Sequence, residues 1–232
     1  MLQLTNTWQD FTHLFFPALC AGCGTDAVGT AAPLCISCIK ELPLTNFHLH
    51  AGNPVEKDFW GRTAIHSATA LCHFTTGSLI QQLLHQLKYK GHQELGHFLG
   101  KLMGASLQQS DRFAGIDLLL PLPLFASRLR KRGYNQSALL CNGMASVLSL
   151  PVLEDVLTRL SATDTQTQKN RIQRWKNMEG RFSVLDPAAL AGKHVLLVDD
   201  VITTGATLEA CGQALLKVEG VQLSIAALAY TV

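Results

Sequence analysis

The stretch from residue 195 to 207, Val-Leu-Leu-Val-Asp-Asp-Val-Ile-Thr-Thr-Gly-Ala-Thr, constrains the fold of this chain more than any other part of it. Its first four residues are an unbroken apolar run, which is typical of a strand buried on both faces of a parallel sheet. Two carboxylates follow, and then a threonine-rich loop leads into a predicted helix over Leu208–Val218. Because ligands of open α/β sheets bind at the carboxyl ends of strands, the stretch predicts a ligand site there.

The residue types at this strand end indicate what the ligand contains. Asp199 and Asp200 cannot bind a phosphate directly, but they can accept hydrogen bonds from sugar hydroxyls or hold a divalent cation such as Mg²⁺. The alternative, a helix-capping acidic pair and an ordinary turn, would leave two carboxylates without partners at a buried strand end, which is costly. The next residues offer hydroxyl and backbone N–H groups at the positive end of a helix dipole, which suits a phosphate; they are Thr203, Thr204, Gly205, Ala206 and Thr207. Together these groups describe a site for a phosphorylated ribose.

Cationic residues are concentrated in the middle of the chain. The formal net charge of +2 is too small to indicate a nucleic-acid-binding protein by itself. Between Arg128 and Arg181, however, ten lysines and arginines are accompanied by only four acidic residues, and such a local excess marks a region that handles anions. Arg128 and Arg132 follow a predicted strand over residues 116–120, so we favour a pyrophosphate site there over an ordinary basic loop.

A second cationic stretch follows a polar tract. Residues 161–168 carry mostly hydroxyl and amide side chains, and Arg171 and Arg174 come shortly after them. A polar loop that leads into cations suits a mobile lid that closes over a charged substrate and excludes water. A solvated surface helix is the alternative for residues 168–176.

An amphipathic helix is predicted over residues 79–89, followed by Lys90 and Gly91. The glycine is a typical helix end, and cations belong in the last turn of a helix. Lys88 and Lys90 therefore have two interpretations: they complement the helix dipole, or they contact the ligand.

Four cysteines form two CxxC pairs near the beginning of the chain. Each pair can place two thiolates on one tetrahedral cation, so the set predicts a closed, structural zinc site with the ligands Cys20, Cys23, Cys35 and Cys38. Residues 1–45 have little core of their own, so we expect the metal to organise them as a zinc-binding module. Residues 46–62 are predicted to be a linker, and residues 63–232 to form the larger domain.

The sequence also leads to an expectation about location. The first ten residues lack the basic region of a signal peptide, and no apolar run reaches the length of a membrane span. We therefore expect a cytoplasmic protein, whose cysteines are thiols or metal ligands rather than disulfides.

Five features in this order resemble the ComF (GntX) family, the competence-associated, phosphoribosyltransferase-like proteins. They are the double CxxC, Lys88-Tyr89-Lys90-Gly91, Pro121–Leu124 with residues 128–136, the series Arg159, Thr163, Gln166, Arg171 and Asn177, and the stretch 195–207. The match covers nearly the whole chain, and its one departure is Tyr134, where phenylalanine is commoner. The resemblance implies an α/β protein with the type I phosphoribosyltransferase fold, a central parallel sheet flanked by helices, and a small N-terminal zinc-ribbon-like module.

The resemblance further implies a substrate and a reaction. Asp199 and Asp200 would bind the ribose hydroxyls of phosphoribosyl pyrophosphate, residues 203–207 its 5′-phosphate, and Arg128, Arg132 and the lid arginines its pyrophosphate, with Mg²⁺ bridging pyrophosphate and ribose oxygens. A phosphoribosyl group would pass to an unidentified acceptor, and the protein would serve DNA uptake in natural transformation. The alternative function is a non-catalytic protein that senses phosphoribosyl pyrophosphate or binds single-stranded DNA, with the DNA-uptake machinery as partner.

Overall fold

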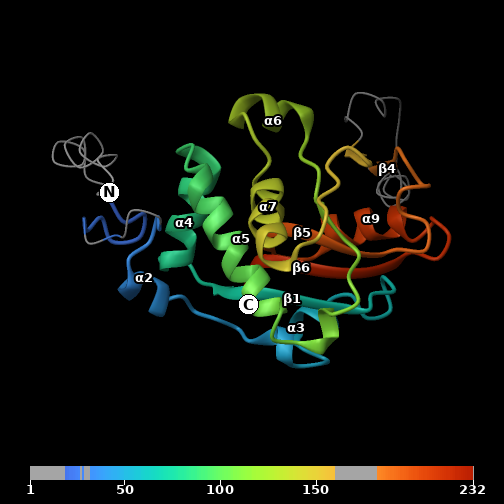
Figure 1. Ribbon diagram of the computed structural model, residues 1–232, viewed down its shortest axis with the longest axis horizontal. Helices are drawn as coiled ribbons and strands as arrows, with labels where there is room; N and C mark the ends of the chain where they lie inside the picture. The colour runs from blue at the N-terminus through green and yellow to red at the C-terminus, as the bar shows by residue number, and fades with distance from the viewer. Residues whose placement is uncertain (1–18, 27, 29–31, 160–181, 232) are drawn as a thin grey trace, which may run out of the picture.

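The computed structural model describes residues 19–26, 28, 32–159 and 182–231. At its centre is a four-stranded sheet with the order β1-β6-β5-β2, in which all neighbouring strands are parallel (Figure 1). These strands are β1 (Ser67–Phe74), β2 (Leu118–Pro121), β5 (His194–Ile202) and β6 (Gln222–Thr231). The predicted central parallel sheet is confirmed.

Alternate residues of β5 belong to two separate cores, one on each face of the sheet. Leu196 and Val198 pack with α4 (Leu79–Tyr89), α5 (Gln93–Leu107) and α7 (Gln136–Leu148). Val195 and Leu197 pack with α3 (Pro54–Lys57) and α9 (Ala206–Leu215). Because successive side chains of a strand point to opposite faces, a sheet covered on both sides requires the unbroken apolar run found in the sequence.

Two glycines bring the backbones of α5 and α7 into contact. A Cβ atom at Gly100 would lie 2.2 Å from the carbonyl oxygen of Leu140, and one at Gly143 would lie 2.2 Å from that of His97. Only glycine fits at these two positions. The close packing fixes α7, whose first turn reaches the carboxyl end of β5.

The remaining elements are short and lie around this core. In Figure 1, α6 projects from the top of the view and α2 lies near the cysteine-rich end. β3 and β4 form a separate antiparallel pair. The elements are α2 (Ile36–Lys40), η1 (Phe47–Leu49), η2 (Asp111–Phe113), α6 (Ala126–Arg132), β3 (Leu157–Arg159) and β4 (Phe182–Val184). No helix in the described part of the chain combines the length and the apolar character needed to cross a membrane.

Residues 46–62, which we expected to be a linker, are packed against the sheet. They contain η1 and α3, and the side chains of Val55 and Phe59 are fully buried in the core beneath β1. Its sequence suggests a linker because it contains Gly52, Pro54 and Gly61, residues that are typical of turns and loops. The module boundaries at residues 45 and 62 stay predictions.

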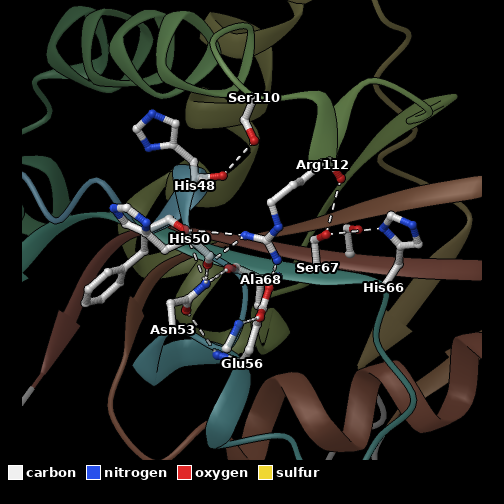
Figure 2. Close-up of polar contacts among 12 residues, drawn as sticks. His48, His50, Asn53, Glu56, His66, Ser67, Ala68, Ser110 and Arg112 are labelled. Carbon is white, nitrogen blue, oxygen red and sulfur yellow. Dashed lines mark hydrogen bonds and ion pairs between the residues drawn. The ribbon is translucent and has the colours of Figure 1, made fainter.

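A buried polar network attaches this segment to β1 and η2. Asn53 donates hydrogen bonds to the carbonyl oxygens of His50 and Ala68, at 3.0 and 2.9 Å. The Glu56 carboxylate accepts from the backbone N–H of Ala68 and forms an ion pair with Arg112, which also donates to the His50 carbonyl (Figure 2). Each partner satisfies a group that would be costly to bury alone.

The Arg112→Met variant should lose about 2–3 kcal/mol of unfolding free energy, because it leaves the buried Glu56 carboxylate without its counter-ion. Urea denaturation measures this loss. Replacing the exposed Lys57 of the same segment by methionine is the control and should change stability by less than about 0.5 kcal/mol. Adding Glu56→Gln to Arg112→Met should restore part of the loss; a double variant less stable than Arg112→Met would contradict this account.

Candidate functional site

The two carboxylates predicted to bind a ligand lie within β5, not beyond its end. β5 continues to Ile202, because its pairing with β6 extends through Val201. Asp199 contacts Ser137 in the first turn of α7, and Asp200 contacts Lys88 in the last turn of α4. The acidic pair therefore lies at the carboxyl edge of β5, next to two helix ends.

Asp200 is paired with Lys88 from the last turn of α4. The Lys88 Nζ atom lies 2.9 Å from Oδ2 of Asp200, and both side chains are largely shielded from solvent. The sequence left Lys88 between a helix-dipole role and a site role. The structure places its ammonium group beside Asp200, and Lys88 is also the last-turn cation that the dipole favours, so a contact with the ligand stays a prediction.

Asp199 is held by the first turn of α7 and by its own strand. Its Oδ1 atom accepts a hydrogen bond from the Ser137 hydroxyl at 3.3 Å and from the backbone N–H of Asp200 at 2.7 Å. Ser137 is held because Asn135 caps α7, accepting from the Ser137 N–H and donating to the Leu122 carbonyl. Burial, and then the charge of Asp200, raise the pKa of Asp199 to about 7.

The Asp199→Asn variant should be more stable than the wild type at pH 8, and this advantage should vanish near pH 4. Folding raises the pKa of Asp199 from its ordinary value of 3.8 to about 7, so between these pH values the folded protein holds a proton that the unfolded chain releases. The destabilisation that Asp199 causes in the wild type therefore grows as pH rises from about 4 to 7. Chemical denaturation at several pH values should show a gain on the order of 2 kcal/mol at pH 8. An equal effect at all pH values would refute the raised pKa.

A loop between β5 and α9 forms a small pocket beside Asp199. The pocket has a volume of about 40 Å³ and is lined by Asp199 and residues 201–208. Gly205 adopts a left-handed conformation, with φ of +69°, directly before the first turn of α9. The predicted phosphate-binding residues 203–207 thus lie at a helix N-terminus, where backbone N–H groups and the helix dipole favour an anion.

The predicted pyrophosphate residues Arg128 and Arg132 lie on a helix rather than in a loop. Residues 126–132 form α6, which buries none of its side chains, so these cations lie on a solvated helix. Its residues are good helix formers, and Gly133 in a left-handed conformation ends it. Arg132 donates to Gln136 at 2.6 Å and lies over the exposed Tyr89 ring, next to Lys88.

The lid predicted between residues 161 and 176, with Arg171 and Arg174, lies outside the described residues. Just before it, the guanidinium of Arg159 lies 3.7 Å from the ring centroid of Phe125, and 5.2 Å from that of Phe182. This stacking holds Arg159 near the start of α6. No pattern in the sequence indicates this contact, because its three members are far apart in the chain.

The four cysteines of the two CxxC pairs form one cluster, separate from the two carboxylates. Their sulfur atoms all lie within 4.8 Å of one another, and those of Cys23 and Cys35 are 3.7 Å apart. Tetrahedral zinc with Zn–S bonds of about 2.3 Å requires sulfur atoms about 3.8 Å apart, so the cluster fits a zinc ion. A Cβ atom at Gly22 would lie 2.6 Å from the Cys38 sulfur, so glycine is required there.

Two of these thiols differ strongly in acidity. Burial opposes ionisation of Cys20, but hydrogen bonds from the backbone N–H groups of Cys35, Cys23 and Gly22 outweigh it and lower its pKa to about 6. Burial and the neighbouring thiols raise the pKa of Cys38. Cys20 is therefore the first thiolate that the cluster offers to a cation.

The cysteine cluster is joined to the rest of the molecule through α4. Gln82 donates to the carbonyl oxygens of Ala21 and Gly22, at 3.2 and 2.7 Å, and Gln86 donates to that of Ala21. Cys20, Cys35 and Cys38 also belong to the same apolar core as α4 and α5. The same helix that carries Lys88 to Asp200 thus supports the cluster.

Comparison with known proteins identifies the part of the chain that carries the carboxylates. The model of the phosphoribosyl transferase domain family matches residues 135–231. DNA utilization protein YhgH of Escherichia coli O157:H7 is 32% identical over 203 residues, which are 86% of this chain and 84% of that protein. Competence protein F of Haemophilus influenzae is 28% identical over 218 residues, 91% of this chain and 90% of that protein.

More distant similarities involve partial matches. Competence protein ComFC of Bacillus subtilis is 28% identical over 62% of this chain and 56% of its own. Among solved structures, glutamine phosphoribosylpyrophosphate amidotransferase from B. subtilis gives a TM-score of 0.39 at 20% identity, over 56% of this chain and 25% of that one. Hypoxanthine phosphoribosyltransferase from Trypanosoma cruzi gives 0.38 at 16% identity, over 60% and 74%.

Proposed function

Since this chain belongs to the ComF family of competence-associated proteins with a phosphoribosyltransferase-like domain, we propose that it binds phosphoribosyl pyrophosphate with Mg²⁺ and transfers the phosphoribosyl group to an acceptor. One observation carries the proposal. Asp199 and Asp200 lie at the carboxyl edge of β5, directly before a loop that lines a pocket at the N-terminus of α9. Carboxylate oxygens that can accept hydrogen bonds from a vicinal diol are thus close to backbone N–H groups that can donate to a phosphate, which supports the proposal.

Each part of the site then has a role. Asp199 and Asp200 accept hydrogen bonds from the ribose 2′- and 3′-hydroxyls, and residues 203–207 hold the 5′-phosphate. The carboxylates of Asp199 and Asp200 are the groups that would hold Mg²⁺, which would supply charge neutralisation when bound. Lys88, Arg128 and Arg132 form a cationic side of the site that stabilises negative charge growing on the departing pyrophosphate.

We further propose that the cysteine cluster holds one structural zinc ion. Four sulfur ligands close the coordination sphere, so the ion organises the surrounding chain and takes no part in the reaction. All seven cysteines are unpaired thiols, which suits the reducing cytoplasm in which we place the protein. Residues 1–45 would be the zinc-binding module and residues 63–232 the phosphoribosyltransferase-like domain.

Calorimetric titration of the purified protein with phosphoribosyl pyrophosphate, with and without Mg²⁺, tests the binding proposal. Saturable binding that requires Mg²⁺ is the expected result, and absence of binding would refute it. Release of pyrophosphate, followed over hours with and without nucleobases and amines as candidate acceptors, tests transfer. Binding without release under all of these conditions would favour a sensor over an enzyme.

A second candidate function, binding of single-stranded DNA, is favoured by the surface around α6. Arg128, Arg130 and Lys131 are exposed there, and the exposed Tyr89 ring beside Arg132 could stack on a base. Fluorescence anisotropy with a labelled oligonucleotide tests it. Affinity that falls steeply between 50 and 200 mM salt would support contacts with several phosphates, and salt-independent binding would exclude them.

A further inference from the structure

The turn that precedes β1 lies directly beneath the proposed phosphate-binding loop, although it is about 140 positions away in the sequence. Phe59 is fully buried, and its ring atoms lie 3.2 and 3.3 Å from where a Cβ atom of Gly205 would be. The turn is closed by its own hydrogen bonds, since the N–H groups of Arg62 and Thr63 both donate to the Phe59 carbonyl at 3.0 Å. It is therefore an ordered support for the loop.

Arg62 connects this turn to the loop and to α9. One guanidinium nitrogen donates to the Asp58 carbonyl at 2.9 Å, within the turn, and to the Thr204 carbonyl at 3.4 Å, within the loop. The other nitrogen forms an ion pair with Glu209, in the first turn of α9. A planar guanidinium can make these contacts together in a fixed geometry, which an ammonium group cannot.

The contact with Thr204 fixes the direction of a backbone donor. The chain has no cis peptide bonds among the described residues, and in a trans peptide the N–H points opposite to the preceding carbonyl. When Arg62 holds the Thr204 carbonyl, the Gly205 N–H is turned away from Arg62. The loop thus keeps one of its N–H groups oriented before any ligand arrives, and such preorganisation lowers the cost of binding.

The contact with Glu209 removes an electrostatic obstacle. A carboxylate in the first turn stabilises the helix through the dipole, but it also opposes a second anion at the same N-terminus. The Arg62 guanidinium compensates that charge. Because Arg62 and Glu209 are partly exposed, at 40% and 21%, screening by solvent keeps this effect moderate.

On the premise of the proposed function, we propose that Arg62 is a positioning residue for the 5′-phosphate of the substrate. It acts through the Thr204–Gly205 peptide and through Glu209, and it does not itself touch the ligand. The role is specific to ligands with a phosphate at the ribose 5′ position, because the cationic side formed by Lys88 and α6 involves other elements.

Three ligands separate this role from a general effect on the site. We expect Arg62→Met to weaken phosphoribosyl pyrophosphate and ribose 5-phosphate about 10-fold in calorimetry with Mg²⁺, the factor that corresponds to roughly 1.4 kcal/mol. Affinity for pyrophosphate should stay within a factor of two. Lys57→Met, which removes an exposed cation from the end of α3 just before the turn, is the matched control and should change none of the three.

Two additional variants test the two contacts separately. Arg62→Lys should retain the pairing with Glu209 but only part of the affinity, and Glu209→Gln in the Arg62→Met background should restore part of it. An equal loss for all three ligands, or no loss for any, would overturn the positioning role. If the wild type bound none of the ligands, the proposed function would fail first, and the positioning role with it.

Hydrogen exchange provides a readout that needs no ligand. Amides of residues 203–207 should exchange faster in Arg62→Met than in the wild type, and at the wild-type rate in Lys57→Met. Unchanged exchange in Arg62→Met would show that Arg62 does not order the loop, whatever the substrate is.

Discussion

The Cys38→Ser variant should purify without zinc and should lose about 4–5 kcal/mol of unfolding free energy, the range typical of a lost structural metal. Cys38 is the ligand whose replacement should matter most, because it is buried and its sulfur lies against the backbone of Gly22. Without the ion, the remaining cysteines lose the bonds that hold this part of the chain in the core that it shares with α4. Metal analysis and urea denaturation measure the two effects.

A buried cysteine outside the cluster provides the control. Cys72 lies in the same apolar core but is not part of the cluster. Cys72→Ala should keep one equivalent of zinc, and a chelator should destabilise it as it destabilises the wild type, whereas a chelator should leave the unfolding of Cys38→Ser unchanged. Wild-type protein that contains no zinc when prepared without chelator, or a Cys38→Ser variant that keeps a full equivalent, would contradict the assignment.

The features that the sequence predicts well are those built from neighbouring residues. The apolar run 195–198, the carboxylates after it and the threonine loop belong to one β-turn-α unit, and local periodicity suffices to read it. The two CxxC pairs are equally local, because each pair defines half of a tetrahedral site. Both were therefore found without knowledge of the tertiary structure.

The partners of these residues were not predictable, because they come from distant segments. Nothing around Lys88 indicates that its ammonium group reaches Asp200. Likewise, Phe59 and Arg62 lie in a segment with the composition of a linker, although they contact the loop at Thr204 and Gly205. Contacts of this kind depend on how the crossovers place α4 and the turn before β1 around β5, which the local pattern does not encode.

The error over α6 has a different origin. The basic segment after the predicted strand 116–120 was interpreted as a pyrophosphate site in preference to an ordinary basic loop, and neither interpretation anticipates a helix. Arg128, Arg130 and Lys131 instead point into solvent on a helix with no buried side. The local conformation there is set by helix propensity and by Gly133, which ends the helix. It is not set by the need to direct all the cations at one ligand.

The Asp200→Asn variant should bind phosphoribosyl pyrophosphate about 10- to 100-fold more weakly while remaining folded. Hydrogen bonds to a charged group contribute roughly 1.5–3 kcal/mol, which corresponds to that range. The amide keeps the shape of the side chain but loses the charge that a ribose diol or Mg²⁺ would require. Stability should fall by about 1–2 kcal/mol, because Lys88 loses its partner at a largely shielded position, and the protein should stay folded.

The matched control for this variant is Asp111→Asn, which removes an exposed carboxylate from η2, before the amino end of β2. It should bind phosphoribosyl pyrophosphate as the wild type does. Lys88→Met distinguishes the two interpretations of that lysine: a ligand contact predicts weaker binding of pyrophosphate, whereas a purely dipolar role predicts a change in stability alone. Unchanged affinity in Asp200→Asn would remove the ribose assignment.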